Sequence, residues 1–88
     1  MNNKVLIKLI VPEIDCSFDI EIPVNEVVWK IKEIMVKSIN DLTGLSLSEA
    51  STYMLINKDT AKIYNNNEVI YQTDIRNATE LILISITQ

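Results

Sequence analysis

The spacing of the apolar residues changes along this chain, and the change limits the folds that the chain can adopt. Residues 17–22 alternate strictly between apolar and polar side chains, as in a β-strand with one buried face. From Glu26 to Leu42 the apolar residues recur about every 3.6 positions, which predicts an amphipathic helix. From Tyr53 onward, short apolar runs indicate strands again. We therefore expect a first pair of strands, one helix and further strands.

Turn and cap residues mark where these elements end. Residues 4–11 form an apolar, β-branched run that Pro12 ends, and the segment that follows is short enough for a hairpin turn containing Cys16 at its end. Asn25 is the expected N-cap of the helix, with Glu26 in the first turn. Gly44, the only glycine in the chain, is expected to close the helix in a left-handed conformation.

The second half of the chain predicts three more strands. We expect them over residues 53–57, 61–64 (short) and 80–86, separated by turns at 58–60, 65–67 and 76–79. The last strand is apolar on both faces, which favours an interior position parallel to the first strand. These elements predict an α+β fold of the β-grasp type, in which one helix packs across a mixed four- or five-stranded sheet.

Composition narrows the range of functions. The chain has 88 residues, enough for one domain over 1–88. The absence of His and the presence of one Cys argue against histidine catalysis and most metal sites, so we expect neither an enzyme nor a cofactor. A formal net charge of −4 without a basic stripe argues against nucleic acid and anionic membranes as partners. The apolar runs are too short to insert in a membrane, and the lone Cys fits a reducing, cytoplasmic location.

The order of elements resembles that of the ubiquitin-like fold. The resemblance extends from Val5 to Ile86 and rests on the hairpin, on residues 23–25 (Pro-Val-Asn) before the helix, and on residues 74–83. Residues 74–83 have an isoleucine, a polar turn and then an apolar strand, as ubiquitin-like proteins do. The chain departs from that pattern at Ala78-Thr79, where a Gly-Asp or Gly-Ser turn is more usual.

Within this fold, the chain resembles the YukD/EsaB-like proteins encoded with type VII (WXG100) secretion systems of Gram-positive bacteria. The segments that suggest this family are residues 18–23, 27–31 and 53–58, the last followed by a short strand and the Asn-rich turn 65–67. The resemblance implies a cytosolic adaptor or regulator that binds a component of the secretion machinery without covalent attachment.

The C-terminal residues bear on an alternative function. Ubiquitin-like modifiers and sulfur carriers end in Gly-Gly, because the terminal carboxylate must pass through a narrow channel to be adenylated. This sequence ends Ser-Ile-Thr-Gln. We therefore expect non-covalent binding rather than conjugation or sulfur transfer. A recognition domain taken from a larger ubiquitin-like scaffold is a third interpretation.

The strands predict an exposed apolar surface. If one face packs on the helix, that face contains Val5, Ile7, Leu9, Phe18, Ile20, Tyr53, Leu55, Leu81 and Leu83. The opposite face then contains Leu6, Ile10, Met54, Ile56, Ile82 and Ile84. A single helix covers one face of a sheet, so the second set is expected to bind a protein partner or a second copy of the chain. The alternatives are a register shift in one strand and a loop that covers the patch.

Three other features have simpler interpretations. Trp29 is either a partner anchor or, more simply, a residue partly buried at the edge of the core. Cys16 has no activating neighbour and is expected to be a passive thiol. The acids Glu13, Asp15, Asp19, Glu21 and Glu26 lack the spacing and the glycine of a calcium loop, so we expect a solvated hairpin, with a basic partner surface as the alternative.

Overall fold

The computed structural model describes residues 3–86. Its elements in chain order are β1 (Lys4–Val11), η1 (Pro12–Ile14), β2 (Cys16–Pro23), α1 (Val28–Thr43), η2 (Ala50–Thr52), β3 (Tyr53–Asn57), η3 (Ile70–Gln72) and β4 (Glu80–Ser85), where η marks a 3₁₀ turn. The expectation about the C-terminal tail falls partly on Thr87 and Gln88, which lie outside the described residues.

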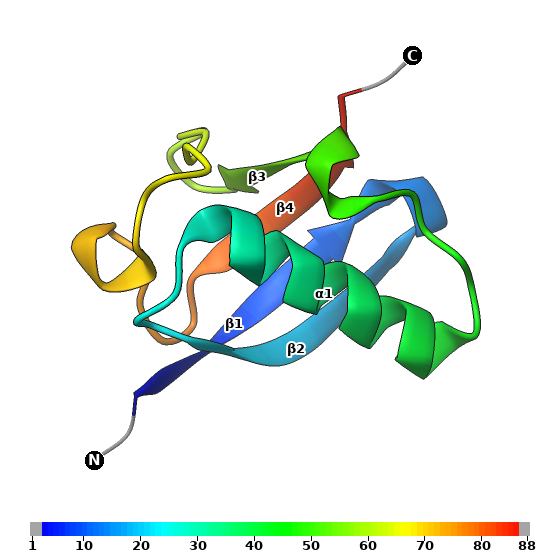
Figure 1. Ribbon diagram of the computed structural model, residues 1–88, viewed down its shortest axis with the longest axis horizontal. Helices are drawn as coiled ribbons and strands as arrows, with labels where there is room; N and C mark the ends of the chain where they lie inside the picture. The colour runs from blue at the N-terminus through cyan, green and yellow to red at the C-terminus, as the bar shows by residue number, and fades with distance from the viewer. Residues whose placement is uncertain (1–2, 87–88) are drawn as a thin grey trace.

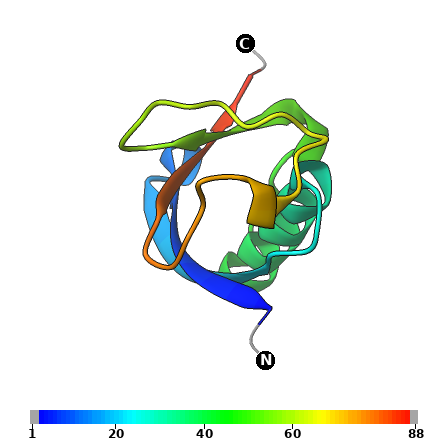
Figure 2. The same ribbon diagram turned by 90° about the vertical axis from the view of Figure 1, so that its left-hand side faces the viewer.

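The strands form one mixed sheet in the order β2-β1-β4-β3. β1 pairs antiparallel with β2 and parallel with β4, and β4 pairs antiparallel with β3. Figure 1 shows α1 crossing one face of this sheet, and Figure 2 shows the helix and the sheet as two layers with η3 between them at one end. This arrangement confirms the predicted β-grasp topology, including the parallel pairing of the first and last strands.

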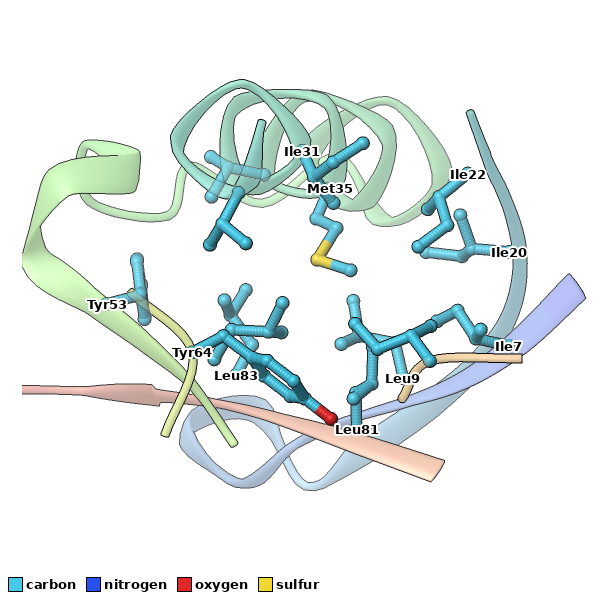
Figure 3. Packing of buried hydrophobic residues seen from close by; sticks show 14 of the residues in the cluster. Ile7, Leu9, Ile20, Ile22, Ile31, Met35, Tyr53, Tyr64, Leu81 and Leu83 are labelled. Carbon is cyan, nitrogen blue, oxygen red and sulfur yellow. The ribbon is translucent and has the colours of Figure 1, made fainter. Parts of the chain in front are cut away.

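The alternation of side chains across the sheet also agrees with the prediction. In β1, Ile7 and Leu9 are fully buried while Leu6 is 50% exposed. Leu9 lies directly opposite Phe18 on one side and Leu81 on the other. The inward residues of all four strands pack on the apolar stripe of α1 (Figure 3), and of the nine residues predicted to face the helix only Val5 and Phe18 are half-buried rather than buried.

The beginning of α1 differs from the prediction. The helix begins at Val28, with Val27 as an N-cap residue that makes no side-chain cap, so Asn25 is not the N-cap. Backbone carbonyls of a distant loop replace a capping side chain: the Val28 amide donates to Glu68 at 2.8 Å and the Trp29 amide to Asn66 at 3.1 Å. Sequence patterns show local caps but not a loop that closes from 40 residues away.

The end of α1 is as predicted. Gly44 has φ of 74° and ψ of 4°, and its amide donates to the carbonyl of Asn40 at 2.9 Å. This left-handed C-cap explains why the single glycine of the chain stands at this position.

The predicted strand over 61–64 is wrong. Only Ile63 pairs with the sheet, through an isolated bridge to Ile56, and the described part of the sheet has four strands. Ala61 has φ of 62°, which interrupts the extended backbone that a strand needs. Smaller differences are that β4 ends at Ser85 and that Cys16 begins β2 rather than lying in the turn, where Asp15 adopts φ of 54°.

Candidate protein-binding surface

The sheet face that α1 does not cover is the candidate site, and we call it the outer sheet face. All six residues predicted for it lie there: Leu6, Ile10, Met54, Ile56, Ile82 and Ile84. Leu6 and Ile84 are exposed and the other four are half-buried, so none belongs to the fully buried core. The structure therefore confirms the position of these side chains, while their role in binding stays a prediction.

Isoleucines form a row across the middle of this face. Ile10 lies opposite Ile82, and Ile82 lies opposite Ile56. The bridge between Ile56 and Ile63 extends the row by one residue, because directly opposed residues point to the same face. Ile63 is 52% exposed and was missing from the sequence-based set. We call Ile10, Ile82, Ile56 and Ile63 the isoleucine row.

A row of charged side chains runs beside the isoleucine row. Lys8 lies opposite Asp19 on β2 and opposite Glu80 on β4. Glu80 forms a 3.4 Å salt bridge with Lys58, just beyond β3. The signs therefore alternate across the sheet. Because the salt bridge is exposed, it adds little stability, about 0–1 kcal/mol.

The charged row separates Leu6 from the isoleucine row. Side chains on one face of a strand follow every second residue, so Lys8 stands between Leu6 and Ile10. Two shallow hollows flank Lys8: one of about 350 Å³ bordered by Ile10 and Cys16, and one of about 600 Å³ bordered by Leu6 and Ala78. A partner thus meets an apolar row, a charged row and a separate leucine.

A polar network of buried Tyr64 and Asn57 and exposed Asp74 supports the end of the isoleucine row. The Tyr64 hydroxyl donates to the carboxylate of Asp74 at 2.5 Å and accepts from the Asn57 side-chain amide at 3.1 Å. Burial, together with the bond to Asp74, raises the pKa of Tyr64 to about 12. Tyr64 also donates through its backbone amide to Leu55, so this network holds the chain on both sides of Ile63 and Ile56.

Asp19 and Glu21, two of the acids singled out in the sequence, lie on the outer sheet face opposite Lys8 and Leu6, whereas Trp29, Glu13 and Cys16 lie elsewhere. Trp29 lies in the first turn of α1, is 47% exposed, and has the Lys30 ammonium 6.0 Å from its ring centre. Glu13 accepts a 2.7 Å hydrogen bond from the Tyr53 hydroxyl, and Cys16 is an exposed free thiol.

The part of the chain that the structure describes contains neither a cluster of metal-ligand side chains nor a helix that could span a membrane. Between residues 3 and 86, the Cys, Asp and Glu side chains form no group of three that could hold a metal ion. Over the same residues, no helix has the length and apolar character needed to cross a bilayer.

Comparisons with known proteins extend the structural description. No protein-family model matches the chain, and no curated protein matches its sequence. A solved ubiquitin-like domain from Arabidopsis thaliana is similar in structure, with a TM-score of 0.72 and 12% identity over 99% of this chain and 82% of that one. The UBL domain of Plasmodium falciparum Dsk2 has a TM-score of 0.67 and 15% identity, over 93% and 97% of the two chains.

A chain of the MycP5-free ESX-5 inner membrane complex is also similar. It has a TM-score of 0.76 and 15% identity, and the match covers 99% of this chain but 22% of that larger one. At these low identities the likeness shows the fold alone. Together with the helix packed on a mixed four-stranded sheet, it shows that the chain has the ubiquitin-like fold.

Proposed function

We propose that this chain is a non-covalent protein-binding domain that engages its partner through the outer sheet face. The isoleucine row carries the proposal, because it aligns four β-branched side chains, Ile63 exposed and the other three half-buried, on a face that no other described element covers. Ubiquitin-like domains are generally non-enzymatic and generally bind proteins, which agrees with this role.

The partner we propose is a component of a type VII secretion machine, and the chain would act beside it as a cytosolic accessory or regulatory protein. Two observations support this choice. The sequence resembles the YukD/EsaB-like proteins over residues 18–23, 27–31 and 53–58. One similar structure is a chain of ESX-5, which is a type VII secretion complex. The charged row would fix the orientation of such a contact, because a partner shifted by one strand would place like charges opposite each other.

Genomic neighbourhood and secretion assays test the choice of partner. A gene beside a membrane ATPase and WXG100 substrates is expected, and deletion of the gene should reduce secretion of those substrates. Wild type should restore secretion, and Ile56→Thr/Ile82→Thr should not. Threonine keeps the β-branched shape that a strand favours, so folding is expected to survive. A neighbourhood without such a system would overturn the secretion role.

Direct binding tests the surface itself. Calorimetry with the purified neighbour-encoded component should show at least a tenfold loss of affinity for Ile56→Thr/Ile82→Thr. The control is Leu45→Thr, which changes a 48% exposed leucine in the connection after α1 and should bind as wild type does. Equal affinity of both variants would place the contact elsewhere on the molecule.

Two alternatives give different results. If a second copy occupies the outer sheet face, sedimentation of the isolated chain will show a dimer that Ile56→Thr/Ile82→Thr dissociates. If the chain is a modifier, incubation with ATP and a cognate activating enzyme will yield a thioester with that enzyme. If it is a sulfur carrier, the same incubation with an added sulfur donor will yield a thiocarboxylate, with AMP as the leaving group. A monomer that forms neither product supports the proposal.

A further inference from the structure

The isoleucine row and the charged row both cross the strands of the outer sheet face, which lies on the side of the sheet away from α1 (Figure 2). Neighbouring members of each row therefore stand one strand apart, about 4.8 Å. One turn of an α-helix rises about 5.4 Å. A helix laid along the isoleucine row would thus place one turn over each strand, with a drift of only about 2 Å between Ile10 and Ile63.

The apolar strip has the width of a single helix. Neighbouring rows on one face of a sheet lie two residues apart along the strands, or about 7 Å. The charged row borders the isoleucine row on one side, and Ile84 and Met54, which lie opposite each other, border it on the other. A helix with its side chains is about 10–12 Å across. It would cover the isoleucine row, with one flank toward the charged row and the other toward Ile84 and Met54.

A second sheet fits this face less well than a helix does. A sheet, including that of a second copy of the chain, would cover several rows at once and so bury Lys8 and Glu80 in the middle of the contact. Removing such charges from water is costly even when they are paired. A single helix leaves the charged row at the margin of the contact, where water still reaches it.

The charged row specifies the signs that a bound helix should carry. Across the strands the signs run negative, positive, negative, positive at Asp19, Lys8, Glu80 and Lys58. Lys8 is exposed and has no salt-bridge partner among residues 3–86, although acids flank it on both neighbouring strands. One flank of a helix presents about one residue per turn. The complementary flank therefore alternates between basic and acidic residues from each turn to the next.

We propose, on the basis of the function proposed above, that the partner contributes an amphipathic α-helix that crosses the strands along the isoleucine row. Its apolar stripe packs on the isoleucines. Its flank places basic residues at the acids of the charged row and acidic residues at the lysines, in alternating turns. The partner segment is about four turns long, one turn for each strand position of the row.

Two synthetic helices of identical composition test the charge pattern. Both are alanine-based, about four turns long, with a leucine at every third or fourth position. The residues beside this stripe in successive turns are Lys, Glu, Lys, Glu in the alternating peptide and Lys, Lys, Glu, Glu in the block peptide. A helix that alternates can reverse its direction on the sheet, so the order of the signs has to change in the control.

Calorimetry measures how both peptides bind to the wild-type chain. Binding of the alternating peptide should be saturable and about fivefold or more tighter than binding of the block peptide. Ile56→Thr/Ile82→Thr should weaken binding of both peptides by about tenfold or more, because both helices use the isoleucine row.

A charge exchange in the chain separates recognition from the stability of the peptides themselves. Like charges one turn apart make the block helix less stable on its own. Lys8→Glu/Glu80→Lys keeps the net charge and turns the row into two acids followed by two bases. This variant should shift the ratio of the two affinities toward the block peptide by about tenfold or more. Lys30→Glu/Glu33→Lys, the matched exchange of a salt-bridged pair on α1, should keep the wild-type ratio.

The outcomes distinguish this inference from the proposed function. Equal binding of both peptides to wild type, or no saturable binding of either, overturns the helical partner. Both results leave the outer sheet face as the proposed contact, since calorimetry with the whole secretion component tests that face without the peptides. A ratio of affinities that Lys8→Glu/Glu80→Lys leaves unchanged, while circular dichroism shows a folded chain, also overturns the helical partner.

Discussion

The ammonium of Lys32 donates a hydrogen bond to the backbone carbonyl of Tyr53, and so joins the second turn of α1 to the first residue of β3. The Tyr53 hydroxyl continues the connection, because it donates to Glu13 in the turn between β1 and β2 at 2.7 Å and accepts from the Ser48 amide at 3.3 Å. Burial is also the main reason that the pKa of Tyr53 is raised. Through its carbonyl and its hydroxyl, Tyr53 thus connects the helix, the edge strand and the hairpin turn.

Replacing Lys32 separates the contribution of its stem from that of its charge. Lys32→Met should leave the free energy of unfolding within about 1 kcal/mol of wild type, since the lost hydrogen bond and the relieved burial of charge oppose each other. Lys32→Ala should cost about 2 kcal/mol or more, because it leaves a cavity where the stem packed. Urea denaturation measures both. A loss for Lys32→Met as large as that for Lys32→Ala would show that the charged end is needed for folding.

The same residue predicts a pH dependence. Burial holds the pKa of Lys32 below its ordinary value of 10.5, so on raising the pH the folded chain releases this proton before the unfolded chain does. Stability therefore increases with pH between the two pKa values for this group. Wild type should gain stability relative to Lys32→Met as the pH approaches 10.5. An unchanged difference across that interval would contradict the shift.

Tyr64 predicts the opposite dependence. Its pKa rises from 10.0 to about 12 on folding, so its contribution to stability is fully present below pH 10 and is lost as the pH rises through about 12. Tyr64→Phe should cost about 1–3 kcal/mol at neutral pH, because the buried Asn57 amide loses its acceptor. The gap between wild type and variant should then narrow from pH 10 upward in urea melts followed by circular dichroism. A gap that stays constant would exclude Tyr64 as the titrating group.

Ala78 and Gly44 both have a left-handed backbone, so exchanging alanine and glycine at these two positions should change the free energy of unfolding in opposite directions. Ala78 has φ of 72°, and its amide donates to the Leu6 carbonyl at 2.8 Å, so the strained turn sets the pairing of β4 with β1. Ala78→Gly should raise the free energy of unfolding by about 0.5–1 kcal/mol. Gly44→Ala should lower it by about 1 kcal/mol, because a Cβ there meets nothing within 4 Å and only backbone strain is added. The same sign for both changes would refute the explanation.

Leu6 and Ile82 should differ as partner contacts. Lys8 and Glu80 stand between Leu6 and the isoleucine row, so Leu6 reaches only the margin of a contact centred on that row. Once the partner is identified, Leu6→Thr should weaken binding by less than about threefold, because Leu6 lies at the margin of the contact. Ile82→Thr should weaken binding at least tenfold, because Ile82 lies at its centre. Calorimetry on the two variants measures the difference, and a larger loss at Leu6 would move the centre of the contact along β1, from the isoleucine row to the far side of Lys8.

The sequence predicted the sheet well because strand alternation leaves few choices. A shift of one residue in β1 would have exposed Ile7 and Leu9 and buried Leu6 and Lys8. Such a shift is unfavourable, because it moves apolar side chains into water and a charged side chain into the core. The outer sheet face follows from the same rule, so its six residues were found without the structure. Gly44 was equally informative, since a left-handed helix end favours glycine.

The features that the sequence did not predict depend on contacts between residues that are distant along the chain. Ile63 joins the isoleucine row through one bridge, and nothing in residues 61–64 indicates that Ala61 breaks the strand with a positive φ. The start of α1 depends on carbonyls of residues 66 and 68. Lys32 was overlooked because it is charged, although its spacing of four residues from Val28 and Val36 places it on the buried stripe. The sequence showed that Ala78 stands where ubiquitin-like proteins usually have a glycine, but it did not show that the backbone of Ala78 has a positive φ.

The central pair of strands also has a consequence for synthesis. β1 and β4 lie side by side in the middle of the sheet, although more than sixty residues separate them along the chain. During translation, β1 and β2 can pair early, but the inner edge of β1 stays open until residues 80–85 have left the ribosome. Leu9 and Ile7 are then apolar side chains without their final neighbours, so edge-to-edge association of nascent chains is expected at this open edge of β1.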